Sequence, residues 1–291
     1  MRLFKRSLIQ RNKRLQLFSR AHWSTAHSST CFSIYYDLKN RLLCGKIMTT
    51  DDIMNISQKA LKWTCVMAIA AATFASSTNV EAQKSEHNKL SKQERKDGWK
   101  LLFNGKKLNK WRNFKKDSVS DGWQVKEGAF VRAGKSAGDI VTKKQYDSFE
   151  LQLEYKISKG GNSGLMFHVT EEESTPWRSG PEIQIQDNVD GHDPQLSGWL
   201  YQLYNSEKDA TKPAGQWNQL RILITPEKCE QYMNGVKYCE YVKGSKDWDE
   251  RVAKSKFAAF SKFGKSKKGH ICLQDHGNEV AFRNVKIREV K

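Results

Sequence analysis

The chain has 291 residues, enough for one large domain or two small ones, and carries a net charge of +18. Residues 1–82 contribute +8, from 12 Lys/Arg and 4 Asp/Glu, and residues 83–291 contribute the remaining +10. The densest basic run is Lys243–Lys268, with nine basic and three acidic residues. Because no nucleic-acid-binding module accompanies this run, we interpret it as a solvated face and expect no nucleic-acid partner. The sequence also lacks a Walker loop, a dinucleotide-binding glycine motif, a zinc pattern and a nucleophile elbow, so none of those enzyme classes is indicated.

A secretory signal peptide is predicted for residues 54–82. A short basic stretch follows Met54, an apolar stretch of about 13 residues comes next, and a polar stretch ends at Val80-Glu81-Ala82. The small residues Val80 and Ala82 at positions −3 and −1 suit signal peptidase, so cleavage after Ala82 is expected. Export to the periplasm or the cell exterior is expected as a result. The apolar stretch is too short for a stable membrane span.

The rest of the chain divides into three parts. Residues 1–53 are interpreted as an upstream extension that translation from Met54 would leave out; the rival interpretation is a basic cytoplasmic tail on an uncleaved anchor. Residues 83–96 are polar and have no apolar face, which predicts a flexible linker. The folded domain is expected at residues 97–291.

Short alternating segments dominate this domain. In residues 149–157 five apolar residues alternate with polar ones, which predicts a strand with one buried and one wet face. Similar runs are found at 123–125, 129–132, 165–169, 182–186, 200–204, 220–224, 229–233, 236–241, 271–274 and 280–290. One short helix is predicted near 247–257. Many short strands with almost no helix indicate an all-β, two-sheet jelly-roll sandwich of the concanavalin A-like or laminin G-like type.

Residues 160–169 form a glycine-rich turn that leads into a predicted strand. Asn162, in the turn, can bond a sugar hydroxyl or hold the turn together. His168 has the parity of Met166, so it is expected on the exposed, concave face if Leu165 and Phe167 pack inward. A turn followed by a surface histidine with no further role is the alternative.

Glu182, Gln184 and Gln186 alternate with two isoleucines, which places the three polar side chains on one face of a strand. A row of acid and amide groups suits a carbohydrate, because hydroxyl groups need both donors and acceptors. Asp187 directly follows this row. The alternative is a solvated outer face.

A second polar cluster, Gln274, Asp275 and His276, stands at the end of a predicted strand about ninety residues later. Histidine can exchange protons near neutral pH or bind a metal ion, although a histidine in a turn often does neither. If this cluster meets the Glu182 cluster in space, the two form a pocket able to move protons and bind sugar hydroxyls.

Two further side chains belong to this hypothesis. Arg283 offers two parallel donors to a carboxylate, and Glu182 or Asp275 is its expected partner. Trp177, in a Pro-, Ser- and Gly-rich segment, is the aromatic residue best suited to stack on a sugar ring, while most other aromatics are expected in the core.

Taken together, these segments resemble the 3-keto-disaccharide hydrolase domain family, a group of secreted bacterial proteins. The resemblance covers about Asp97–Lys291. The order and spacing of its motifs agree with the family, at Gly98-Trp99, Leu102–Lys106, Trp111, Gly161–Gly164, Gly180–Glu182, Gln184, Asp187-Asn188, Gly215–Asn218, Met233–Gly235, Ser255–Phe257, Gly269–Gly277 and Phe282–Ile287.

The resemblance implies a concanavalin-like jelly roll and action on 3-keto-glycosides. The ketone at C3 of such a substrate acidifies the C2 proton, so a base can remove it, the C1 substituent can leave and water can add back. His276 is expected as base or acid, Glu182 as its partner and Asp275 as a third catalytic residue. Substrate contacts are expected from His168, Gln184, Asp187, Asn162, Arg283, Trp177 and Gln274. A divalent cation held by His168, Glu182 and His276 is an open alternative at the enolate, since neither spacing nor resemblance requires one.

Three other functions stay open at this point. A two-carboxylate glycosidase would use Glu182 with Asp187 or Asp275. A non-catalytic carbohydrate-binding module, or a protein-adhesion domain of laminin G type, would use the same sandwich without chemistry. The sequence does not indicate an oligomeric state.

Overall fold

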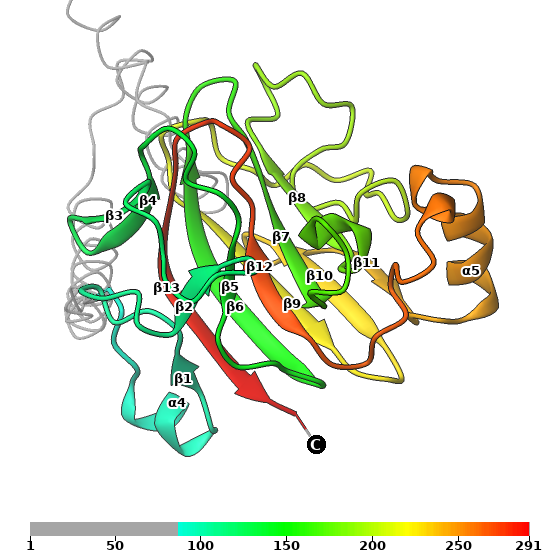
Figure 1. Cartoon of the computed structure of the whole chain (residues 1–291), viewed down its shortest axis with the longest axis horizontal. Helices are drawn as coiled ribbons and strands as arrows, with labels where there is room; N and C mark the ends of the chain where they lie inside the picture. The colour runs from blue at the N-terminus through cyan, green and yellow to red at the C-terminus, as the bar shows by residue number, and fades with distance from the viewer. Residues whose placement is uncertain (1–86, 291) are drawn as a thin grey trace, which may run out of the picture. The chain divides into compact units, whose positions relative to one another are not determined.

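The computed structural model describes residues 87–290, which form a β-rich domain (Figure 1). The predicted signal peptide at 54–82, its cleavage site after Ala82 and the extension at 1–53 lie outside the described residues. Among residues 87–290, no helix combines the length and the apolar character that crossing a bilayer demands.

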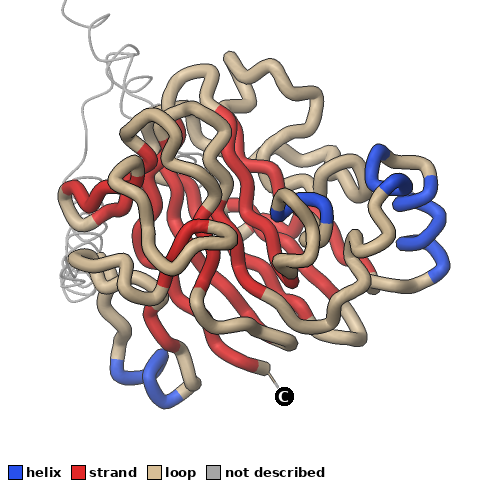
Figure 2. The backbone as a smooth tube through the Cα atoms, in the orientation of Figure 1, coloured by secondary structure: helices blue, strands red, loops and turns tan. Residues whose placement is uncertain are grey.

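Two antiparallel sheets make up the domain, and the few helices lie at its periphery (Figure 2). The larger sheet has eight strands in the order β11-β10-β9-β6-β13-β4-β3, with β1 paired to β13. The smaller sheet has five strands in the order β2-β5-β12-β7-β8. The strands of the larger sheet are β1 (Lys100–Leu101), β3 (Trp123–Lys126), β4 (Ala129–Arg132), β6 (Phe149–Ile157), β9 (Asn218–Ile224), β10 (Cys229–Met233), β11 (Val236–Tyr241) and β13 (Val280–Glu289). Those of the smaller sheet are β2 (Trp111–Asn113), β5 (Ile140–Thr142), β7 (Asn162–Val169), β8 (Glu182–Gln186) and β12 (His270–Leu273). The predicted all-β jelly-roll sandwich is confirmed.

The core lies between the two sheets. The five apolar side chains of β6 are each at most 2% exposed, as their alternation predicts. They belong to one cluster with Leu165 and Phe167 of β7 and with Ile183 and Ile185 of β8. Each such side chain contributes about 1.5–3 kcal/mol of hydrophobic stabilisation when fully buried. The even-numbered residues of β8 are therefore forced to the outer face of the smaller sheet.

The helix predicted near 247–257 is present as α5 (Lys246–Ala253), followed by the short 3-10 turn η2 (Lys256–Ala259). Ser245 caps α5 by accepting a hydrogen bond from the backbone N–H of Trp248 at 3.2 Å. The helix stops because Ser255 caps a new turn, its Oγ accepting from the N–H of Phe257 at 3.1 Å. One further 3-10 turn, η1 (Pro176–Arg178), follows β7.

The prediction of a flexible linker at 83–96 is wrong for the part that the structure describes. Residues Lys92–Lys96 form a short helix, α4, which begins at a capping box made by Ser91 and Glu94. Asn88 is 6% exposed and exchanges two hydrogen bonds with Asn284 of β13, at 2.6 and 2.8 Å. The segment is polar because these residues bond to the outer face of the larger sheet, which is itself polar.

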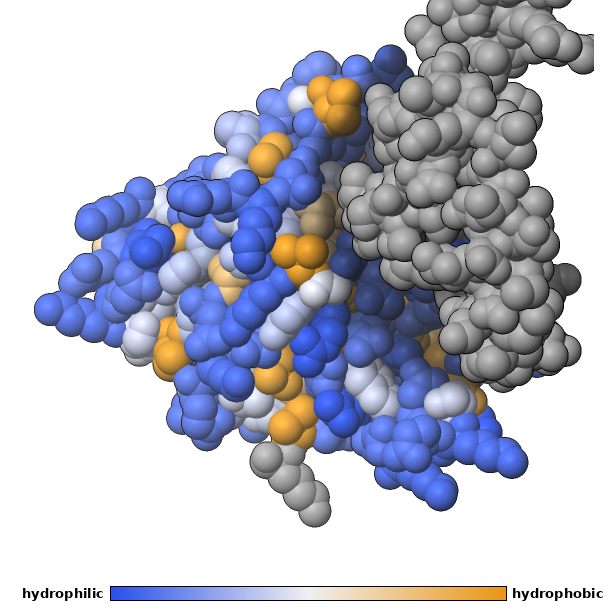
Figure 3. All heavy atoms as spheres, turned by 180° about the vertical axis from the view of Figure 1, so that it is seen from behind, coloured by the Kyte–Doolittle hydropathy of each residue, from blue (hydrophilic) through white to orange (hydrophobic). Residues whose placement is uncertain are grey.

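The face turned away from the viewer in Figure 1 is mostly hydrophilic outside its grey atoms, and its apolar side chains lie scattered in small patches (Figure 3). No broad apolar docking surface is seen among the described residues of that face.

Candidate functional site

A pocket of 180 Å³ lies on the outer face of the smaller sheet, above β7 and β8. We call it the β8 pocket; its walls are Asn162, Trp177, Glu182, Gln184, Asp193, Tyr201, Lys256, Gln274 and His276. The expectation that the segments around Glu182 and His276 meet in space is confirmed.

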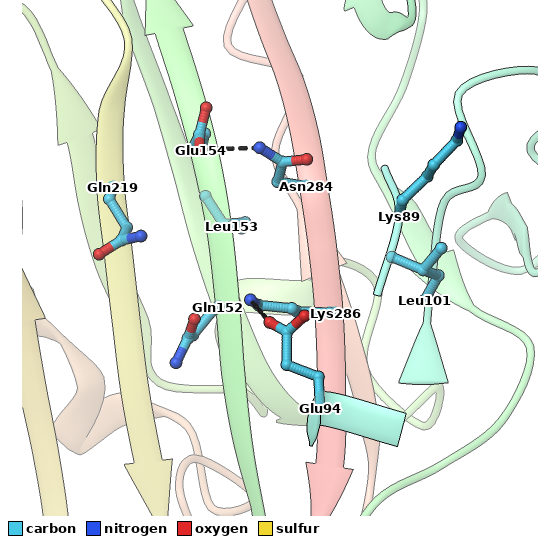
Figure 4. A pocket seen from close by; sticks show the side chains of 9 residues that line it. All are labelled: Lys89, Glu94, Leu101, Gln152, Leu153, Glu154, Gln219, Asn284 and Lys286. Atoms are coloured by element: carbon cyan, nitrogen blue, oxygen red, sulfur yellow. Dashed lines mark hydrogen bonds and ion pairs between the residues drawn. The ribbon is translucent and has the colours of Figure 1, made fainter. Parts of the chain in front are cut away.

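A second hollow of 210 Å³ lies on the outer face of the larger sheet, where α4 approaches β6 and β13 (Figure 4). Four of its polar groups bond in pairs: Lys286 pairs with Glu94, and the Nδ2 of Asn284 donates to Glu154 at 2.8 Å (Figure 4). Groups that already satisfy one another have little left to offer a ligand.

The β8 pocket differs because several of its polar atoms have no partner. Both amide atoms of Gln184 and the Oε1 of Gln274 are buried without a hydrogen bond, as is the Oδ1 of Asn162. Leaving a buried polar atom unpaired costs about 1–3 kcal/mol, so such atoms call for a ligand or ordered water. Their concentration in one pocket selects it as the candidate site.

Strand β8 supplies the floor of this pocket. Glu182, Gln184 and Gln186 share the outer face, as predicted, but they are only 6%, 1% and 2% exposed. The loop that follows β8 covers them, since the Nε2 of Gln186 donates to the carbonyl oxygens of Asp193 and Gln195 at 3.0 and 2.7 Å. Alternation alone would place these three side chains in water, but in the folded domain the loop encloses them.

The carboxyl group of Glu182 is the most perturbed acid of the pocket. Burial raises the pKa of Glu182 to about 8, because the charged form loses its hydration. The nearby charge of Lys256 and a hydrogen bond with Gln274 favour ionisation but do not outweigh burial, and Asp139 and Asp193 reinforce the rise. Glu182 therefore holds its proton at neutral pH and can act as a proton donor.

His276 reaches the pocket from the loop after β12, and its side chain is exposed at the pocket mouth. That loop is tied to β7 at three points. The N–H of Gln274 donates to the carbonyl oxygen of Gly164 at 2.9 Å, and the Oγ of Ser163 donates to the carbonyl oxygen of Gln274 at 2.8 Å. The N–H of Asn162 donates to the Oδ1 of Asn278 at 3.1 Å. His276 is thus positioned by bonds on both sides of it in the chain.

Asp275 lies outside the pocket walls and anchors the same loop. Its carboxylate accepts from Arg132 Nε at 2.5 Å and from the N–H of Gly138 at 2.6 Å. These partners lower the pKa of Asp275 against the opposing effect of burial. The N–H of Asp275 in turn donates to Asp139 at 2.8 Å, and burial raises the pKa of Asp139 to about 6. Asp275 thus holds the loop next to His276 and does not itself line the pocket.

His168 does not reach the β8 pocket, and the prediction that it faces the exposed surface is wrong. The side chain is 3% exposed. Its Nε2 lies 2.7 Å from the carbonyl oxygen of Asp147, and its Nδ1 lies 2.8 Å from the Nζ of Lys243. Burial, followed by the charge of Lys243, lowers the pKa of His168 to about 3, so the ring is neutral.

A bulge in β7 explains this error. His168 has a φ of +53°, and the register between β12 and β7 shifts between His270 and Cys272. Val169 consequently packs with Met166 on the outer face, while the ring of His168 lies 5.3 Å from that of Phe167. The alternation of β7 ends at Phe167, two residues before the strand itself ends at Val169.

Asp187 and Arg283 also lie outside the pocket walls. Asp187 accepts from the N–H groups of Gly160 and Val189 at 2.9 and 3.1 Å and so fastens two turns together. Arg283 pairs with Glu154 at 2.7 Å on the larger sheet, with its guanidinium 4.0 Å from the ring centre of Trp217. The predicted pairing of Arg283 with Glu182 or Asp275 is wrong, because β13 belongs to the other sheet.

The three residues considered for a divalent cation are not assembled. Glu182 and His276 share the pocket, whereas His168 is buried beside Lys243. Within residues 87–290, no group of three or more His, Cys, Asp or Glu side chains is arranged to hold a metal ion. A cation would therefore need ligands from the substrate or water at this site.

Three pocket residues were missed by sequence reasoning. Asp193 and Tyr201 lie in the loop after β8, where the strand expected at 200–204 does not form and residues 201–203 make a turn instead. The hydroxyl of Tyr201 donates to Asp193 at 2.8 Å. Lys256 opens η2. Its only signal in the sequence was its place in the Ser255-Lys256-Phe257 motif.

Comparison with known proteins identifies relatives of this chain. The family model of the 3-keto-alpha-glucoside-1,2-lyase-like domain matches residues 98–288. A 3-keto-disaccharide hydrolase of Bacteroides thetaiotaomicron is 30% identical over 228 residues, which cover 66% of this chain and 78% of the relative. A crystal structure from Parabacteroides distasonis, provisionally named a glycosyl hydrolase, is 36% identical with a TM-score of 0.67 and covers 71% of this chain and 100% of that one. A second structure from that organism, also provisionally named so, is 25% identical with a TM-score of 0.50, covering 66% and 99%.

These similarities show that the chain is a carbohydrate-active enzyme of the glycoside hydrolase type. The match of the family model to residues 98–288, about two thirds of the sequence, shows that the chain belongs to the 3-keto-alpha-glucoside-1,2-lyase-like domain family.

Proposed function

We propose that the β8 pocket cleaves 3-keto-glycosides by removing the C2 proton, expelling the C1 substituent and adding water. The observation that carries this proposal is the pairing of a buried, protonated Glu182 with an exposed His276 in one pocket. The names of the relatives support the substrate class, and the chemistry follows from the pocket's own groups.

The reaction is divided between an acid and a base. His276 takes the proton from C2, and the C–H electron pair forms an enolate with the C3 carbonyl. The enolate electrons then form a C1–C2 double bond while the C1–O bond breaks, and Glu182 gives its proton to the leaving oxygen. Addition of water across the double bond, OH to C1 and H to C2, completes a net hydrolysis, and His276 releases its proton to solvent while Glu182 takes one up, which restores both residues. General acid–base catalysis of this kind is worth about 10²–10⁴-fold in rate.

The protonation of the Glu182 carboxyl group supports its role as the acid. With a pKa of about 8 it is mostly protonated at neutral pH, so it can donate without first taking up a proton. An ionised carboxylate would be needed for the nucleophile of a two-carboxylate glycosidase. Asp187 and Asp275, the partners expected from the sequence for such a mechanism, both lie outside the pocket walls.

The pocket amide groups that have no hydrogen-bond partner can bind the hydroxyl groups of the sugar. Gln184 offers one donor pair and one acceptor at the pocket floor, and Asn162 and Gln274 add acceptors on either side. Trp177 lines the pocket and is partly buried, which suits a ring that stacks on a sugar face. Because His276 and Lys256 are exposed, the aglycone has room to extend into solvent.

The direct test is turnover by the protein of 3-keto-trehalose, 3-keto-lactose and 3-keto-glucosides of both anomers, with and without chelator. Glu182→Gln and His276→Ala are each expected to lower kcat by about 10²–10⁴-fold. Glu227→Gln and His87→Ala serve as matched controls, since both side chains are exposed outside the pocket. Wild-type protein that binds these sugars without cleaving any of them would instead favour a carbohydrate-binding module.

Export is a separate proposal. We infer from residues 54–82 that the enzyme leaves the cytoplasm and that signal peptidase cuts after Ala82. N-terminal sequencing of the protein recovered from the periplasm or the medium of expressing cells tests it. A first residue other than Gln83 would move the cleavage site, and full-length protein retained in the cytoplasm would refute export.

A further inference from the structure

Lys256 is held at the mouth of the β8 pocket by aromatic rings. Its Nζ lies 4.1 Å from the ring centre of Tyr201, 5.2 Å from that of Phe257 and 5.4 Å from that of Trp177. Each ring face attracts the ammonium group, by about 0.5–1 kcal/mol at an exposed site. Three rings around one ammonium restrict a side chain that would otherwise sample many rotamers.

The backbone beneath Lys256 is also fixed. The N–H of Lys256 donates to the Oε1 of Gln202 at 3.1 Å, and the next residue, Phe257, is 1% exposed. The ring of Phe257 stacks on that of Phe263 with centres 4.0 Å apart and planes 6° apart. The turn η2 therefore presents the ammonium from a rigid base.

The charge of Lys256 is not neutralised by an ion pair. No carboxylate of residues 87–290 comes within 4.0 Å of its Nζ. Neighbouring lysines differ in this respect: Lys262 pairs with Glu172 at 2.8 Å, and Lys265 pairs with Asp249 at 3.3 Å. The charge acts on the pocket instead, where it is the largest single influence favouring ionisation of Glu182.

Cleavage by C2 deprotonation places a negative charge where none existed in the substrate. As the C2 proton moves to His276, the C–H electron pair becomes the C2–C3 double bond and the carbonyl electrons move to the oxygen on C3. A fixed cation beside that oxygen lowers the barrier, because it is already oriented when the charge develops.

We propose that the Lys256 ammonium stabilises the enolate oxygen at C3. This inference rests on the function proposed above and adds a catalytic residue to it. The substrate is uncharged before the proton leaves, so Lys256 favours the transition state over the bound substrate. Its removal is therefore expected to lower kcat far more than it changes KM.

The test compares Lys256→Met, which keeps the apolar stem, with Lys256→Arg, which keeps the charge. Lys262→Met is the matched control, because Lys262 is exposed, follows η2 closely and pairs with Glu172. The measurements are kcat and KM on a 3-keto-glucoside and the rate of C2–H exchange with D2O, followed by NMR. Lys256→Met is expected to lower kcat and the exchange rate by about 10²–10³-fold, with Lys256→Arg restoring part of both. Lys262→Met should match the wild type.

The outcomes separate the two proposals. Wild-type protein without activity on 3-keto-glycosides would refute the function and this inference with it. An active wild type with an equally active Lys256→Met variant would overturn the role of Lys256 alone, as would a variant whose only defect is a raised KM. Lys256→Gln replaces the Met variant if the latter does not fold, as judged by circular dichroism.

Discussion

Gly164 of β7 lies directly against the carboxyl group of Glu182 on β8. A Cβ built at position 164 would stand 2.2 Å from Oε1 of Glu182 and 2.9 Å from its Cδ. The two residues are diagonal neighbours across the strand pair, since Gly164 is aligned with Gln184 and Met166 with Glu182. The carboxyl group of Glu182 can occupy this position only because residue 164 has no side chain.

Gly164→Ala should therefore displace the Glu182 side chain. Overpacking of this kind costs about 1–3 kcal/mol of stability, and the displaced acid should lose much of its catalytic effect. Chemical denaturation and kcat measure the two consequences. Gly134→Ala is the matched control: its Cβ would meet the Cα of Gly122 at 2.9 Å, so stability should fall while kcat is retained. Equal activity in the Gly164 and Gly134 variants would mean that catalysis does not depend on the position of the Glu182 carboxyl group beside Gly164.

The pH profile should report the protonation of Glu182. Since the acid form is required and its pKa is about 8, kcat/KM should fall about tenfold per pH unit above that value. Glu182→Gln should remove this limb along with most of the activity. Initial rates across neutral and alkaline pH provide the measurement, and a profile that stays flat well above pH 8 would assign the acid elsewhere.

Stability should depend on the same group. The folded-state pKa of Glu182 is raised above its ordinary value of 4.5, so its contribution to stability is fully present below about 4.5 and is lost as pH rises through about 8. The free energy of unfolding of the wild type should therefore fall across this range, because the unfolded chain releases the proton of Glu182 at a lower pH than the folded one. Denaturation near pH 5 and near pH 9 should show a smaller loss for Glu182→Gln than for wild type. An identical loss in both proteins would contradict the assigned pKa.

Asp275→Asn should weaken the loop that carries His276. The substitution removes the charge that Arg132 pairs with and leaves donors of Arg132 and Gly138 poorly satisfied, at a cost of about 1–3 kcal/mol. The kcat should fall, yet by less than in His276→Ala, because the imidazole is still present. Glu154→Gln breaks a comparable pair with Arg283 on the other sheet and should leave kcat unchanged. A loss in Asp275→Asn as large as that in His276→Ala would instead give Asp275 a direct chemical role.

His168→Asn should affect stability and spare catalysis. The ring is buried and bonded to Asp147 and Lys243, so its loss should cost about 1–3 kcal/mol. The pKa of His168 is lowered to about 3, so its contribution to stability is present above about 6.5 and is lost as pH falls toward 3. Denaturation between pH 6.5 and the acid range should therefore show a weaker pH dependence in the variant. A strong drop in kcat of the folded variant would bring His168 back into the site.

Some features of the molecule could be predicted from sequence because they depend on short-range patterns. The alternation in residues 149–157 specifies β6, and the alternation in 182–186 places Glu182 and Gln184 together on the outer face of β8. The meeting of Glu182 with His276 was predicted from chemistry and from the family resemblance.

The remaining features depend on contacts that no local pattern encodes. The bulge at His168 reverses the side on which that residue lies, and the backbone of Gly269 passes so close that a Cβ there would be 2.3 Å from the carbonyl carbon of His168. Arg283 finds Glu154 because β13 pairs with β6, a topology that period-two reasoning does not fix. The pocket also receives Lys256 from η2 and Asp193 and Tyr201 from the loop after β8, and only the folded chain brings these segments together.

The measurement that bears most directly on the account is cleavage of a 3-keto-glucoside in D2O, with NMR analysis of C2 in the released 3-keto-sugar. Free 3-keto-glucose in the same buffer controls for spontaneous exchange. Loss of the C2 proton and water addition predict deuterium at C2 in every released molecule, at a rate that falls together with cleavage in His276→Ala. Release of a sugar that keeps its original C2 proton would contradict the account and indicate direct displacement at C1.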